Sequence, residues 1–88
     1  EVRQALIELE DALLRFDVSR RAEASAERNL ASAHDLWKNG LSRHSDVLDA
    51  RSRLTESQNE VIAARADVAL SRSLLERAAG RLKGTDEP

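Results

Sequence analysis

The sequence predicts an all-α protein, a long antiparallel two-helix coiled-coil hairpin. Apolar residues recur every seven positions in both halves of the 88-residue chain, and the one marked break lies near the middle, at residues 39–50 (NGLSRHSDVLDA). Seven-residue spacing is typical of helices that supercoil around each other with a left-handed twist. The chain has only three Gly and one Pro, too few turn residues for a meander of strands.

The first helix is predicted over residues 2–39. Large residues stand seven positions apart, a small residue follows each by three, and Glu23 fills the one missing large position. The large residues are Val2, Leu9, Phe16, Leu30 and Trp37, and the small ones are Ala5, Ala12, Ser19, Ala26 and Ala33. Small side chains let a second backbone approach closely, so this stripe is expected to form the seam, with Trp37 packing at its narrow end.

A tip turn is predicted over residues 40–45. Gly40 can adopt the left-handed conformation that ends a helix. Either Ser42 or Ser45 can cap the second helix, and Asp46 follows in its first turn, where negative charge is favoured. The two helices are therefore expected to be antiparallel.

The second helix is predicted over residues 46–83, followed by a polar tail at 84–88. Its large and small residues continue without a break over five heptads. The large residues are Val47, Leu54, Val61, Val68, Leu75 and Leu82, and the small ones are Ala50, Ser57, Ala64, Ser71 and Ala78. The first five large residues are expected to pack in the seam together with Trp37.

Both helices carry more apolar residues than one seam can use. The surplus residues are Leu6, Ile7, Leu13, Leu14 and Val18 in the first helix, and Leu48, Ile62, Ala66, Ala69, Leu70 and Leu74 in the second. A two-helix hairpin should be polar outside its seam. The surplus predicts a second packing face, as in a helix that belongs to the wall of an α-helical barrel.

Composition and spacing exclude several functions. Fourteen basic and sixteen acidic residues are intermixed, without the basic face that nucleic-acid binding requires. The chain has no Cys, and its two histidines, His34 and His44, lack metal-ligand spacing, so no metal site is expected. An exposed turn offers no catalytic pocket, and no glycine loop for phosphate is present. We therefore predict neither an enzyme nor a cofactor.

The break resembles a known family at the level of short motifs. Residues 36–41 (LWKNGL) and 46–50 (DVLDA) resemble the periplasmic tip of TolC-like outer-membrane efflux proteins. In that family an aromatic, a basic residue and Gly precede a DVLDA-type segment; Trp37 stands where Tyr is more usual. Residues 1–3 resemble the start of the family's second long tunnel helix, and residues 74–80 resemble the close of its return helix.

The resemblance implies a role in transport without a cofactor. Three subunits of that family form an outer-membrane barrel with a helical tunnel across the periplasm of Gram-negative bacteria. A periplasmic adaptor (membrane fusion) protein, linked to an inner-membrane pump, meets the tunnel tips. The parent would thus be a homotrimer, and this segment, itself soluble, would lie in the periplasm. The implied adaptor-docking tip is Asn39, Gly40, Leu41 and Ser42, and the implied tunnel-gate acids are Asp46 and Asp49.

The chain departs from the family pattern in several ways. The membrane strands are absent, so this chain alone cannot make a pore; it begins with Glu1 and is expected to be an excised or processed segment. Ser42 precedes Arg43, unlike the basic latch of some family members. From their spacing alone, Asp46 and Asp49 simply complement the helix N-terminus.

Two alternative functions stay open. One is the hairpin of a periplasmic adaptor, although no RLS-type tip is found, and the other is a structural coiled-coil module. Self-association of the isolated hairpin also stays open.

Overall fold

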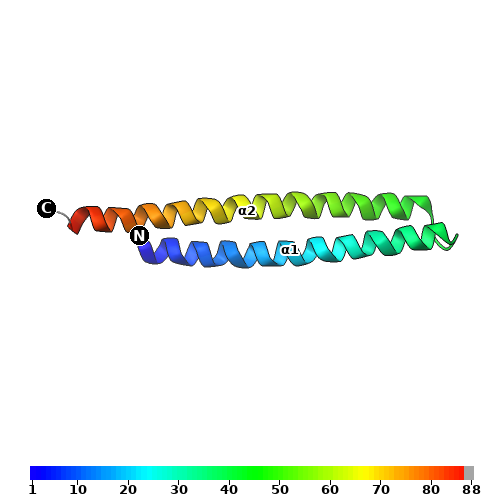
Figure 1. Cartoon of the computed structure of the whole chain (residues 1–88), viewed down its shortest axis with the longest axis horizontal. Coiled ribbons are helices and arrows are strands. Elements are labelled where there is room, and N and C mark those ends of the chain that lie inside the picture. The colour runs from blue at the N-terminus through cyan, green and yellow to red at the C-terminus, as the bar shows by residue number, and fades with distance from the viewer. Residues whose placement is uncertain (87–88) are drawn as a thin grey trace.

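The computed structural model describes residues 1–86, with side chains described through residue 81. Two helices, α1 (Val2–Lys38) and α2 (His44–Asp86), run antiparallel and side by side (Figure 1). They form a rod with principal extents of 74 × 14 × 12 Å, and the described residues contain no strand. The predicted all-α hairpin is confirmed.

The helix bounds differ from the predicted ones by one to three residues. α1 ends at Lys38 rather than at residue 39, and the connecting loop spans residues 39–43. α2 begins at His44, two residues early, and continues to Asp86, three residues past its predicted end. The predicted polar tail is therefore helical through Asp86, and its last two positions, 87 and 88, lie outside the described residues.

α1 ends in a Schellman motif centred on Gly40. Gly40 has a φ of +73°, in the left-handed region, as its place after the helix predicts. Its N–H donates to the Trp37 carbonyl at 3.0 Å, and the Leu41 N–H donates to the Leu36 carbonyl at 2.8 Å. These two bonds satisfy carbonyls that the helix end would otherwise leave without a partner. The direction of the chain is thus reversed by local hydrogen bonds.

α2 begins without the predicted serine cap. The Ser42 hydroxyl donates instead to the Ala33 carbonyl at 3.5 Å, and Ser45 already lies inside the helix. Asp46 replaces the serine: its Oδ2 accepts the Arg43 N–H at 3.2 Å, and its own N–H donates to the Arg43 carbonyl at 3.1 Å. This is one half of a capping box, and it accounts for the early start of α2.

The seam between the helices is thin and consists mainly of small residues. The buried residues are Ala5, Ala12, Ser19 and Ala26 in α1, and Val47, Val61 and Ala64 in α2. Seven other large residues of the heptad stripes are half-buried: Val2, Leu9, Phe16, Leu30, Leu54, Val68 and Leu75. Leu82 lies outside the residues whose side chains are described. Trp37 is only partly packed: its side chain is 40% exposed, and its ring lies 4.8 Å from that of His44 at the start of α2. No large side chain is fully enclosed among the described residues.

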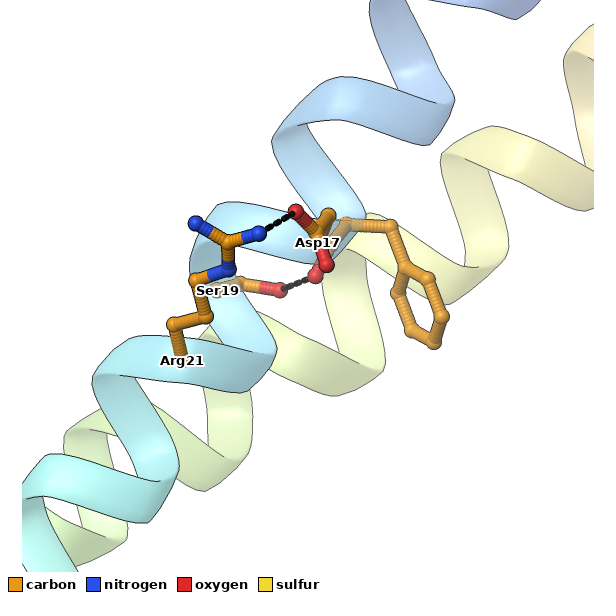
Figure 2. Close-up of polar contacts among 4 residues, drawn as sticks. Asp17, Ser19 and Arg21 are labelled. Carbon is orange, nitrogen blue, oxygen red and sulfur yellow. Dashed lines mark hydrogen bonds and ion pairs between the residues drawn. The ribbon is translucent and has the colours of Figure 1, made fainter.

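Polar groups near the middle of the seam are satisfied locally. Figure 2 shows the Ser19 hydroxyl donating to the Phe16 carbonyl at 2.8 Å, which offsets the cost of burying it. The same view shows Arg21 paired with Asp17 at 3.1 Å on the exposed face. Arg20 and Arg65 each place a guanidinium 5.9 Å from the centre of the Phe16 ring, so this ring links the two helices.

Candidate functional site: the hairpin tip and the rod edges

The tip combines a tight turn with exposed apolar side chains. Leu41 follows the left-handed Gly40 and is 74% exposed, more than any other large apolar residue of the described chain. A Cβ built on Gly40 would meet no atom within 4 Å, so the space beside the turn is open. Leu36 and Leu48 are also exposed next to the turn. The end of the rod is therefore an accessible apolar surface.

The other two residues of the predicted docking tip serve the turn itself. The Asn39 N–H donates to the Asp35 carbonyl at 3.1 Å, and its φ of −92° places it at the helix C-cap. Ser42 is half-buried against Ala33. A partner that approaches the tip would therefore meet Gly40 and Leu41 before it meets Ser42.

Trp37 belongs to a ring cluster that the sequence analysis missed. His34 lies edge-on to the indole, with ring centres 5.8 Å apart, and His44 lies tilted against it at 4.8 Å. His34 and Trp37 share a face because they are three residues apart on α1. His44 reaches the indole because α2 starts at this residue. The i, i+3 spacing was readable from the sequence, whereas the contribution of α2 depended on a helix boundary.

Asp46 and Asp49, the predicted tunnel-gate acids, line a groove along one side of the rod. The groove has a volume of about 590 Å³. Its α2 side also carries Glu56, Glu60 and Arg53, and the α1 residues that line it are small or short. Those α1 residues are Ala22, Ser25, Ala26 and Asn29. Asp46 accepts a hydrogen bond from the Arg43 N–H at the start of α2, so it has a structural role. Gating by either aspartate stays a prediction.

The surplus apolar residues of the sequence are all exposed, and most lie far from the tip. We call Leu6, Ile7, Leu13, Leu14 and Val18 the α1 edge, and Ile62, Leu70 and Leu74 the α2 edge. Between these edges and the tip, residues 19–35 and 49–61, all described by the structure, expose no large apolar side chain. Exposed apolar surface is therefore concentrated in two places, the tip and the edges of the terminal half.

The described residues offer no arrangement for metal binding. No three His, Asp or Glu side chains among them gather closely enough to hold a metal ion. Within the same part of the chain, neither helix contains a segment both long and apolar enough to cross a bilayer.

Comparison with known proteins gives no family for this chain. No protein-family model, no curated protein and no solved structure matches it. The resemblance of residues 36–50 to a TolC-like tip therefore rests on the short motifs alone.

Proposed function

We propose that this chain is the periplasmic tunnel-tip hairpin of a TolC-like outer-membrane channel, used in tripartite efflux or type I secretion, and that its tip docks a periplasmic adaptor. The carrying observation is the turn: Gly40 has open space beside it, and the adjacent Leu41 is largely exposed. A helical turn of a partner can approach such a glycine closely, because no side chain stands in the way. The inner-membrane pump would act through the adaptor.

The docking surface in this proposal has a small apolar centre and a charged rim. Leu41 supplies the projecting side chain, and Trp37 supplies a half-exposed aromatic ring of the kind that anchors many interfaces. Lys38 and Arg43 lie on either side of the turn in the sequence. The partner tip should therefore offer a shallow apolar surface flanked by hydrogen-bond acceptors or carboxylates.

In the proposed homotrimer, Asp46 and Asp49 of each subunit would form acidic rings at the tunnel entrance. Like charges brought close together repel, and cations would be favoured over anions there. Docking at the tip would stabilise an open arrangement, in which the carboxylates within each ring lie farther apart. The groove beside α2 is consistent with this role, since four carboxylates and one guanidinium, that of Arg53, line it along one helix face and give that face a net negative charge.

The test is binding of the hairpin to the tip hairpin of a TolC-type adaptor, measured by calorimetry. Gly40→Asn keeps a residue that tolerates the left-handed conformation but adds a side chain where close approach is needed. Leu41→Glu removes the apolar contact. Each is expected to weaken binding at least ten-fold, about 1.4 kcal/mol.

The matched control is Leu14→Glu, the same change at an exposed residue roughly 35 Å from the tip. It should bind the adaptor like the unmodified chain. Adaptor binding that is absent, or that is equally strong in all four proteins, would rule out docking through this tip.

A structural coiled-coil module is the second candidate, favoured by the exposed α1 and α2 edges. It predicts association through the edges and no affinity for an adaptor tip. The two candidates therefore differ in which end of the rod binds a partner.

A further inference from the structure

Asn39 and Gly40 form the chain's single Asn–Gly pair, and they lie at the turn. In such a pair the backbone nitrogen of the second residue can attack the side-chain amide of the first, because glycine has no Cβ to obstruct the approach. A bond forms between Gly40 N and Asn39 Cγ, the Cγ–Nδ2 bond breaks, and the amide nitrogen takes up a proton and leaves as ammonia. Water then opens the five-membered imide at either carbonyl, which gives aspartate or isoaspartate.

The surroundings of Asn39 leave its side chain open to this reaction. Asn39 is exposed, and none of the side-chain hydrogen bonds of the described residues involves its amide. A Cβ built on Gly40 would meet no atom within 4 Å, so water has access to the turn. The other two asparagines, Asn29 and Asn59, lie inside α1 and α2, and each precedes a residue larger than glycine. The tip is therefore the most susceptible site in the chain.

The backbone of the intact turn opposes the reaction. The Gly40 N–H donates to the Trp37 carbonyl at 3.0 Å, so this nitrogen is not free to attack. Asn39 has a ψ of 7°, which places the Gly40 nitrogen beside the Asn39 backbone nitrogen and away from Cβ. A five-membered ring needs the Gly40 nitrogen on the same side as Cβ. Ring closure therefore requires loss of the hydrogen bond and rotation about ψ, and both mean that the turn has opened.

We infer that Asn39 is a site of spontaneous modification by water, and that opening of the tip controls its rate. Helix ends open locally at a lower free energy than helix interiors, so open turns occur within the folded chain. Isoaspartate lengthens the backbone by one carbon before Gly40, and aspartate places a negative charge at the C-terminal end of α1, where the helix dipole disfavours it. Either product weakens the Schellman motif. This goes beyond the proposed function and does not depend on it, since the reaction requires no partner.

The rate at Asn39 is measured on the full chain at mildly alkaline pH, where backbone nitrogens lose their proton more readily. Peptide mapping by mass spectrometry quantifies aspartate and isoaspartate at each asparagine, with Asn29 and Asn59 as internal references. Asn39 should react first, and unfolding the helices with guanidinium chloride should accelerate its reaction at least about five-fold. An Asn39 that stays intact under both conditions, or that reacts equally fast under both, overturns the inference.

A matched pair of variants opens the turn while leaving the Asn39–Gly40 pair unchanged. Leu41→Pro removes the N–H that donates to the Leu36 carbonyl at 2.8 Å, whereas Leu41→Ala keeps it. The proline variant should react at least about three-fold faster than the alanine variant in native buffer. Equal rates would overturn control by the turn. If the proline variant loses helix content by circular dichroism, the comparison with the unfolded chain still decides, because it needs no variant.

The effect of the product on the tip has its own test. Asn39→Asp installs one product directly, and Asn59→Asp adds the same charge inside α2 as a control. Hydrogen exchange at the Gly40 and Leu41 N–H groups should be at least about two-fold faster in the Asn39 variant than in the control. Exchange that is equal in the two variants, or slower in the Asn39 variant, would show that modification does not weaken the turn.

Discussion

The tip and the terminal half of the rod both expose apolar side chains, but they differ in shape and in what holds them. At the tip, Leu41 projects from a turn that backbone hydrogen bonds define. In the terminal half, the exposed residues lie in straight stripes along helices whose seam is tightest at Ala12, which is fully buried. A convex end suits an end-on contact, and a straight stripe suits lateral packing of another helix. Similar composition therefore predicts different partners at the two ends.

Overpacking the seam should give the largest effect on stability, and the effect should be larger in the terminal half of the rod than in the tip half. Ala12→Leu forces three more carbons into a site of 0% exposure, and we expect a loss of about 1–3 kcal/mol of unfolding free energy. Ala33→Leu, at a half-buried position of the tip half, should lose less than half as much. Thermal unfolding at one fixed concentration measures both, because association shifts apparent stability. Equal losses would show that the seam is uniformly packed.

The seam was predictable from the sequence because it depends only on spacing. With a helix known, a seven-residue period decides which side faces the partner, and Ala5, Ala12, Ser19 and Ala26 are buried accordingly. Gly40 was predictable for a similar reason: it follows a helical stretch, where the left-handed conformation is needed.

The details of the tip were less predictable, since each depends on where α2 starts. Asp46 rather than a serine caps α2, and His44 joins the ring cluster, because the helix begins at His44. Terminal residues of helices are the least certain part of any sequence prediction. Trp37 fits the heptad register, yet it stays 40% exposed although its ring lies 4.8 Å from that of His44 on α2. Docking by Leu41 and gating by Asp49 involve partners outside this chain and stay predictions.

Two glycines provide a matched pair for the next prediction, with effects of opposite sign. Gly40→Ala places a side chain at a φ of +73° and should cost about 1 kcal/mol, although there is space for the new atom. Gly80→Ala lies inside α2 with open space around it and should stabilise by about 0.5–1 kcal/mol, because alanine favours the helix. Chemical denaturation of both variants measures the difference. Two changes of the same sign would contradict the view that the tip depends on backbone conformation and the terminal half on helix propensity.

The smallest effect tests whether local hydrogen bonds hold the tip. Asp46→Ala removes the carboxylate that accepts the Arg43 N–H and should cost about 0.5–1 kcal/mol, the usual range for a bond at a helix N-terminus. Asp49→Ala removes the same charge one turn later, where no backbone N–H needs an acceptor, and should change stability by less than about 0.3 kcal/mol. Hydrogen exchange at the first turn of α2 should report the same order, with faster exchange in the Asp46 variant. Equal effects of the two substitutions would mean that charge near the helix end, and not the bond to Arg43, sets the start of α2. The tip would then be held less specifically than the terminal seam, and the contrast between the two ends of the rod would be one of shape alone.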